Sequence, residues 1–178
     1  MLRLRVLALA AVLAAARAGG ASAEIVLEGV HWQAGRAEAG RVAAWQDVKV
    51  LVDGPPKLDN RLRARVVLKN RGAKADEGIL IRYSMTARVA PASGAAAEGA
   101  WAIPFVVEER RVPRVAADKM IEVPLETGAA LGLYARRLAR AGWWLDRVKL
   151  QVMIEPHPGS AVLQTVEDSL EIAREPKP

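Results

Sequence analysis

Two neighbouring stretches of the sequence alternate apolar and polar residues along their whole length. In the first, residues 62–70, the apolar residues that share one face are Leu62, Ala64, Val66 and Leu68. In the second, residues 79–89, they are Ile79, Ile81, Tyr83, Met85, Ala87 and Val89. Successive side chains of a β-strand point to opposite faces, so a period of two predicts half-buried strands and excludes a helix for both stretches.

Weaker alternation predicts further short strands along the rest of the chain. They lie at 24–30, 47–52, 101–112, 119–125 and 147–155, with a loop at 35–40. Pro104 favours an edge position or a bulge for its strand, and Pro124 favours an edge position or a strand end, because proline cannot donate to a strand ladder. Residues 162–173 suit either a helix or a strand. We favour a closing strand at 169–174, since the sheet otherwise lacks its last member.

The period changes to that of a helix between residues 129 and 141. The apolar side of this predicted helix carries Leu131, Tyr134, Ala135 and Leu138, and the other side carries Arg136, Arg137 and Arg140. Thr127 is the expected N-cap, and Gly142 has the position of the glycine that ends a helix. We expect the helix to cover one open end of the fold, with its apolar side on the core.

The order of these elements predicts an all-β fold. Seven or eight short strands separated by turns, with no repeating strand–helix–strand unit, indicate an immunoglobulin-like antiparallel β-sandwich. One short helix is inserted between the late strands. The sandwich domain is expected at 24–174, followed by a disordered tail at 175–178.

Residues 1–23 have the three parts of a secretory signal peptide. Two arginines precede an apolar run at 6–16, and small residues at 21–23 form a cleavage site. The run is shorter than the roughly 20 residues that span a bilayer. We therefore expect cleavage near Ala23, export to the periplasm or the cell exterior, and no membrane span in the mature chain. Removal of the predicted signal peptide takes away three arginines and lowers the formal net charge of the chain from +6 to +3.

Two stretches resemble bacterial immunoglobulin-like domains of the CARDB type, the cell-adhesion-related domain of bacteria. The sequence LRARVVLKNRG at 62–72 is similar to their strand with an Asn-x-Gly turn. The sequence at 148–172 is similar to their closing hairpin, whose acidic stretch is matched in part by Glu167-Asp168-Ser169. The resemblance covers about a third of the chain. It implies an extracellular interaction or spacer module without catalytic residues.

The sequence offers few groups for catalysis. Cysteine is absent, which excludes disulfides and a thiol nucleophile, and His31 and His157 are the only histidines. Neither a glycine-rich phosphate loop nor a nucleophile elbow occurs in the sequence. We therefore expect no enzyme, no metal and no other cofactor.

A basic stripe is the first candidate for partner binding. Its members share the polar side of the strand at 62–70 or flank it, and they are Arg61, Arg63, Arg65, Lys69 and Arg71. The stripe could dock a protein or an acidic polymer. Alternatively, it pairs across the sheet with carboxylates of the strand at 119–125, such as Glu122, and with Glu126. We favour the pairing.

Tryptophans are the second candidate. Trp143 and Trp144 follow the predicted helix, and adjacent side chains of a strand diverge, so one is expected in the core and the other is available to a partner or a glycan. Trp32, Trp45 and Trp101 are expected to fill the core and the ends of the sandwich.

These features together predict an exported, non-catalytic interaction or accessory module that binds a protein partner and no nucleic acid. A carbohydrate-binding module that uses exposed tryptophans is the first alternative. A small hydrolase without a recognisable motif is the second.

Overall fold

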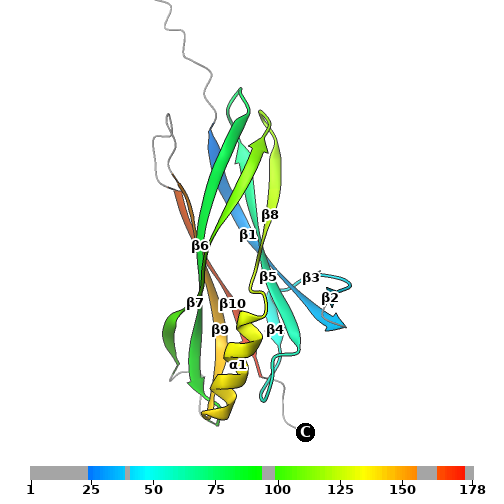
Figure 1. Ribbon diagram of the computed structural model, residues 1–178, viewed down its shortest axis with the longest axis vertical. Helices are drawn as coiled ribbons and strands as arrows, with labels where there is room; N and C mark the ends of the chain where they lie inside the picture. Colours follow the sequence, from blue (N-terminus) through cyan, green and yellow to red (C-terminus); the bar gives the residue numbers. More distant parts are fainter. Residues whose placement is uncertain (1–23, 39–40, 94–98, 156–163, 175–178) are drawn as a thin grey trace, which may run out of the picture.

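The computed structural model describes residues 24–38, 41–93, 99–155 and 164–174. Within these ranges, the chain forms an elongated sandwich of two β-sheets with one helix at its lower end (Figure 1). The predicted signal peptide, His157 and the predicted tail at 175–178 lie outside the described residues.

The first sheet is built on three long strands in the order β1-β5-β8. They are β1 (Ile25–Glu38), β5 (Asn60–Asn70) and β8 (Met120–Glu126). Two short strands, β2 (Arg41–Val42) and β3 (Gln46–Asp47), pair with β1. All pairs are antiparallel, and β8 lies at the edge, as Pro124 predicts.

The second sheet has the order β4-β10-β9-β6-β7. Its strands are β4 (Val50–Val52), β10 (Gln164–Ala173), β9 (Trp143–Ile154), β6 (Asp76–Pro91) and β7 (Ala100–Val115). Only β4 and β10 run parallel. The edge strand β7 contains Pro104, where its register against β6 shifts. The two sheets and the helix between β8 and β9 form the immunoglobulin-like sandwich that the sequence predicts.

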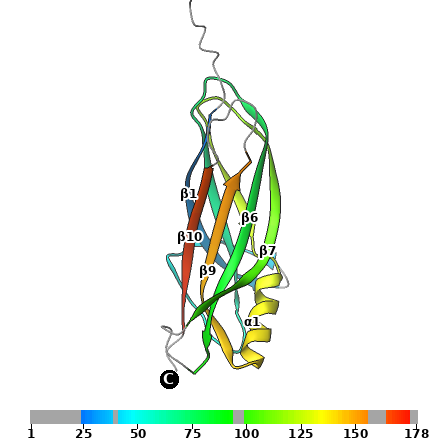
Figure 2. The same cartoon turned by 90° about the vertical axis from the view of Figure 1, so that its left-hand side faces the viewer.

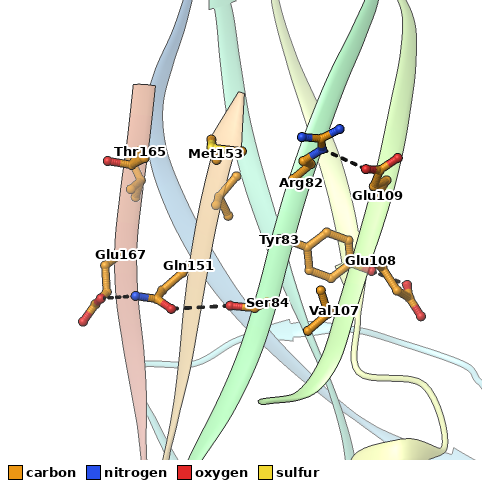
Figure 3. A pocket seen from close by; sticks show the side chains of 12 residues that line it. Arg82, Tyr83, Ser84, Val107, Glu108, Glu109, Gln151, Met153, Thr165 and Glu167 are labelled. Atoms are coloured by element: carbon orange, nitrogen blue, oxygen red, sulfur yellow. Dashed lines mark hydrogen bonds and ion pairs between the residues drawn. The ribbon is translucent and has the colours of Figure 1, made fainter. Parts of the chain in front are cut away.

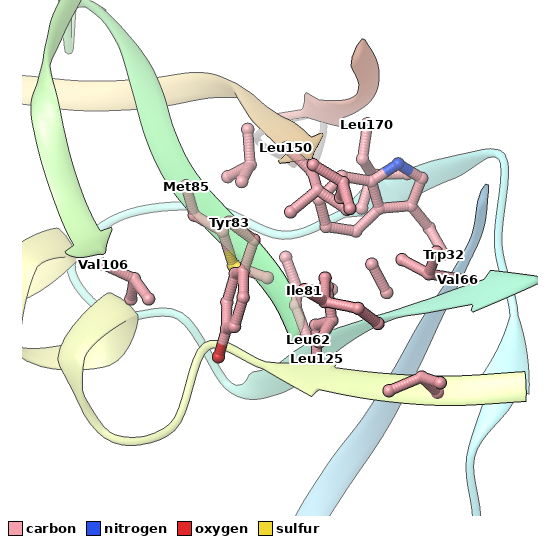
Figure 4. Close-up of a cluster of buried hydrophobic side chains, with 14 of the residues drawn as sticks. Trp32, Leu62, Val66, Ile81, Tyr83, Met85, Val106, Leu125, Leu150 and Leu170 are labelled. Carbon is pink, nitrogen blue, oxygen red and sulfur yellow. The ribbon is translucent and has the colours of Figure 1, made fainter. Parts of the chain in front are cut away.

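The core lies between the two sheets (Figure 4). The predicted inward face of β5 is at most 1% exposed at Leu62, Ala64, Val66 and Leu68, which confirms its register. The inward face of β6 is confirmed from Ile79 to Ala87. The prediction that Val89 points inward is wrong. A register shift between Arg88 and Val89 leaves Val89 half-buried, and Ala90 is buried in the core instead.

The first strand is longer than its sequence predicts. β1 pairs with β5 as far as Arg36, so the predicted loop is wrong for residues 35–38, and residues 39–40 lie outside the described ranges. Gly35 serves close packing here: a Cβ at this position would lie 2.6 Å from the carbonyl oxygen of Ala44.

The predicted strand at 47–52 is divided between the two sheets. β3 pairs with β1 in the first sheet, whereas β4 pairs with β10 in the second. The chain crosses from one sheet to the other in the two residues that separate β3 from β4. The alternation of apolar and polar residues alone gives no signal for such a crossing.

The ambiguous stretch at 162–173 contains the strand β10, which begins at Gln164 and continues through the expected closing segment. Asp168 falls on its inward side with Leu170 and Ile172. The indole Nε1 of Trp32 donates a hydrogen bond to Asp168 Oδ1 at 3.3 Å, which gives this carboxylate a partner.

The helix α1 (Ala130–Arg140) is anchored by Leu131 and Ala135, both at most 1% exposed. Tyr134 and Leu138 are half-buried against the core. Thr127 is not the N-cap: its hydroxyl donates to the carbonyl oxygen of Leu62 at 2.9 Å, and the N-cap residue is Ala129, which makes no side-chain cap hydrogen bond. No helix in the described part of the chain has the length and apolar character needed to cross a membrane.

Candidate functional site

The basic stripe lies on the outer face of the first sheet, where its central residue is enclosed by carboxylates. Arg65 Nη1 donates to Glu122 Oε2 at 2.6 Å, and Arg65 Nη2 donates to Asp47 Oδ1 at 3.0 Å. Glu122 is the cross-strand partner that the sequence proposes. A hydrogen bond from Gln33 and the positive charge of Arg65 lower the pKa of Asp47.

Other members of the stripe also have partners within the protein. Arg63 Nε donates to Gln33 Oε1 at 2.8 Å, and its guanidinium lies 4.2 Å from the ring centroid of Trp45. The remaining contacts are Arg61 Nη1 to the Gly128 carbonyl oxygen at 2.7 Å and Arg71 Nη2 to Glu28 Oε1 at 2.8 Å. Glu126 lies opposite Arg63 in the register, but Arg63 contacts Gln33 and Trp45 instead.

The tryptophans have three different environments. Trp32 and Trp144 are in the core, at 5% and 0% exposure, and Trp45 is half-buried beneath Arg63. Trp143 is 42% exposed, so the pair at the start of β9 diverges as expected. The prediction that Trp101 fills the core or an end of the sandwich is wrong. Trp101 is 44% exposed, and the ammonium of Lys149 lies 4.7 Å from its ring centroid.

The outer face of the second sheet carries a groove across β10, β9, β6 and β7, with a volume of about 650 Å³ (Figure 3). The strand register places its outward side chains in two rows. One row is Val107, Ser84, Gln151 and Glu167, and the next is Glu109, Arg82, Met153 and Thr165. A groove of this volume is within the range of ligand sites in proteins.

Hydrogen bonds connect the polar groups of the groove. Ser84 Oγ donates to Gln151 Oε1 at 3.4 Å, and Gln151 Nε2 donates to Glu167 Oε2 at 2.9 Å (Figure 3). In the second row, Arg82 Nε donates to Glu109 Oε1 at 2.8 Å. These contacts hold the carboxylates in fixed positions along the groove.

A buried phenol lies below the β7 side of the groove. The Tyr83 hydroxyl donates to Glu108 Oε2 at 2.6 Å, and burial, followed by this hydrogen bond, raises the pKa of Tyr83. Tyr83 is therefore a hydrogen-bond donor at neutral pH. Within the described ranges, no group of three histidine, aspartate or glutamate side chains is placed to hold a metal ion.

The edge of the groove on β7 is apolar and open. Val107 is 74% exposed, and Ile103 on the same strand is 81% exposed. Sequence reasoning missed both residues, because apolar and polar residues do not alternate along 103–111 and so mark no outward face. The usable signal was the presence of large apolar residues at outward positions of a strand assigned to an edge.

The fold and this surface together define a small immunoglobulin-like β-sandwich with one open apolar edge. No family model and no curated protein matches the chain.

Proposed function

We propose that this chain is an exported, non-catalytic interaction module that binds an extended segment of a partner protein along β7. The observation that carries the proposal is the pair of exposed apolar residues Ile103 and Val107 on a free edge strand, directly beside the groove. The resemblance of residues 62–72 and 148–172 to CARDB-type domains implies the same class of function.

The backbone of β7 can supply the main interaction. Among the described strands, β7 pairs with β6 alone, so its other edge presents N–H and C=O groups that no described strand pairs. Pro104 and Pro113 interrupt this edge and leave residues 105–112 between them. An extended segment added at this edge forms main-chain hydrogen bonds, while its alternate side chains contact the sheet face.

Charge specifies the partner segment further. The outward side chains of the groove include two carboxylates, those of Glu109 and Glu167, and one guanidinium, that of Arg82. This acidic excess belongs to a chain whose formal net charge is +6, or +3 after loss of the predicted signal peptide. The segment that fits therefore alternates apolar residues, which pack beside Val107, with lysine or arginine.

The peptide-binding part of the proposal is tested with a displayed library of random ten-residue peptides. We expect enrichment of sequences that alternate apolar and basic residues, and loss of their binding in Val107→Asp. Val52→Asp is the matched control, because Val52 is 57% exposed on β4, at the opposite edge of the same sheet. Enrichment of acidic peptides, or equal loss in both variants, contradicts the proposal.

Export is tested separately by the intact mass of protein recovered from the cell envelope or the medium. The expected chain begins at Glu24. Recovery from the cytoplasm with Met1 retained contradicts export.

The exposure of Trp101 and Trp143 favours a second candidate function, glycan binding by aromatic stacking. The Trp101 ring already carries the Lys149 ammonium, so a sugar must replace this contact. A glycan array that shows binding by the parent protein and none by Trp101→Ala would support this candidate over the peptide.

A further inference from the structure

The helix α1 presents one stripe of residues to solvent. Leu133, Arg136, Arg137 and Arg140 are spaced by three, four and seven residues, which places them on one face. All four are exposed, because Leu131 and Ala135 hold the opposite face on the core. We call these four residues the α1 stripe.

The arginines of the α1 stripe have no counter-charge nearby in the sequence. Residues 127–145 contain Arg136, Arg137 and Arg140 and no aspartate or glutamate. Across the described ranges, none of the three arginine side chains takes part in a hydrogen bond or ion pair. Their positive charge is therefore available to a partner outside the chain.

Apolar side chains accompany this charge. Leu133 is 46% exposed within the stripe, and Trp143 is 42% exposed three residues after Arg140. The helix lies at one end of the elongated sandwich, far from the first residues of β1 (Figure 2). The stripe on this helix is exposed and can therefore contact an extended surface.

We propose that the α1 stripe and Trp143 dock the protein on the surface of a bilayer that contains anionic phospholipids. Arginine binds phosphate with two parallel hydrogen bonds, and tryptophan is favoured at the level of the headgroups. The convex face of a helix fits a layer of headgroups, whereas a peptide requires a groove or a strand edge. This second surface is separate from the peptide site on β7 and goes beyond the proposed function.

The experiment measures sedimentation of the mature protein, purified from the cell envelope, with phosphatidylcholine vesicles that contain or lack phosphatidylglycerol. We expect binding only to the anionic vesicles. Each arginine near an anionic surface contributes about a fivefold factor to partitioning, so the triple change Arg136→Ala, Arg137→Ala and Arg140→Ala lowers it on the order of a hundredfold.

The matched control removes the same charge elsewhere, with Arg36→Ala, Lys49→Ala and Arg111→Ala, all at exposed positions. It is expected to retain most of the binding, and an equal loss would show non-specific attraction and overturn the proposal. Binding to heparin or to an acidic peptide without binding to the anionic vesicles would also overturn it, in favour of a soluble polyanion.

Contact of Trp143 with lipid is tested by fluorescence quenching with brominated phospholipids. Quenching should fall in Trp143→Phe and persist in Trp101→Phe, which removes a tryptophan of similar exposure on β7. Unchanged quenching in Trp143→Phe would show that this end does not face the bilayer.

Discussion

The sequence contains two similar clusters of arginines, one on β5 and one on α1. The structure gives the two clusters different surroundings. On β5, Arg65 lies between Glu122 and Asp47, and Arg63 lies between Gln33 and Trp45. On α1, arginines in adjacent turns have no such partners among the described residues. A positive cluster therefore indicates a docking surface only when its neighbours in space leave its charge uncompensated.

The reason lies in the geometry of the two elements. A strand inside a sheet has a neighbour on each side, and β1 and β8 bring polar and acidic residues to the arginines of β5. A helix that packs through one face has no neighbour on the other. The following predictions test this difference, beginning with the largest expected effect.

The first prediction tests which face of α1 is buried. Leu131→Ala should lower the free energy of unfolding by about 2–5 kcal/mol, because it removes a fully buried side chain. Leu138→Ala should cost less, since Leu138 is half-buried, and Arg137→Ala should change stability by at most about 0.5 kcal/mol. Denaturant unfolding measures all three. A larger cost for Arg137→Ala would show that the arginine face is the buried one.

The second prediction compares one arginine from each cluster. Arg65→Ala should cost about 1 kcal/mol, because two partly exposed ion pairs are lost. Arg140→Ala, the control, should be nearly neutral. High salt should reduce the cost of Arg65→Ala by screening the pairs. Equal costs for the two variants would remove the distinction between the clusters.

The third prediction concerns the two tyrosines, one in the second sheet and one in α1. Burial raises the pKa of Tyr83 in β6 and of Tyr134 in α1 above the usual value of 10.0. Because the native pKa is raised, their contribution to stability is complete below pH 10.0 and is lost as the pH rises above it. In Tyr134→Phe, ultraviolet titration should show Tyr83 ionising at a higher pH in the native protein than in denaturant. Coincident titrations would contradict the burial of Tyr83.

The smallest expected effect is at Asp47. The hydrogen bond from Gln33, and then Arg65, lower its pKa below 3.8, so its contribution to stability is present above pH 3.8 and is lost as the pH falls through the native pKa. Gln33→Ala should raise the pKa of Asp47 in an NMR titration of the carboxyl group. Lys69→Ala is the control, because Lys69 does not contact Asp47. A matching shift in both variants would mean that general electrostatics, rather than this hydrogen bond, sets the pKa.

The sequence determined the elements that depend on local periodicity. The alternation of β5, and of β6 as far as Ala87, determined which side chains point inward, because one face of each strand had to be buried. The helical spacing at 129–141 likewise placed Leu131 on the core and the arginines in solvent. Prolines located two edge strands, because they lack the N–H that a central strand donates.

Only the tertiary structure decided which charges and apolar groups stay available. The partners of Arg63 and Arg65 come from β1, β3 and β8 and from the chain beside β3, and no local pattern links these segments. The groove joins side chains from four strands, and Val107 faces outward because it lies opposite Ser84 in the pairing of β7 with β6. Local periodicity determines which face of an element is buried, whereas the neighbours of the other face are determined by how distant segments pair.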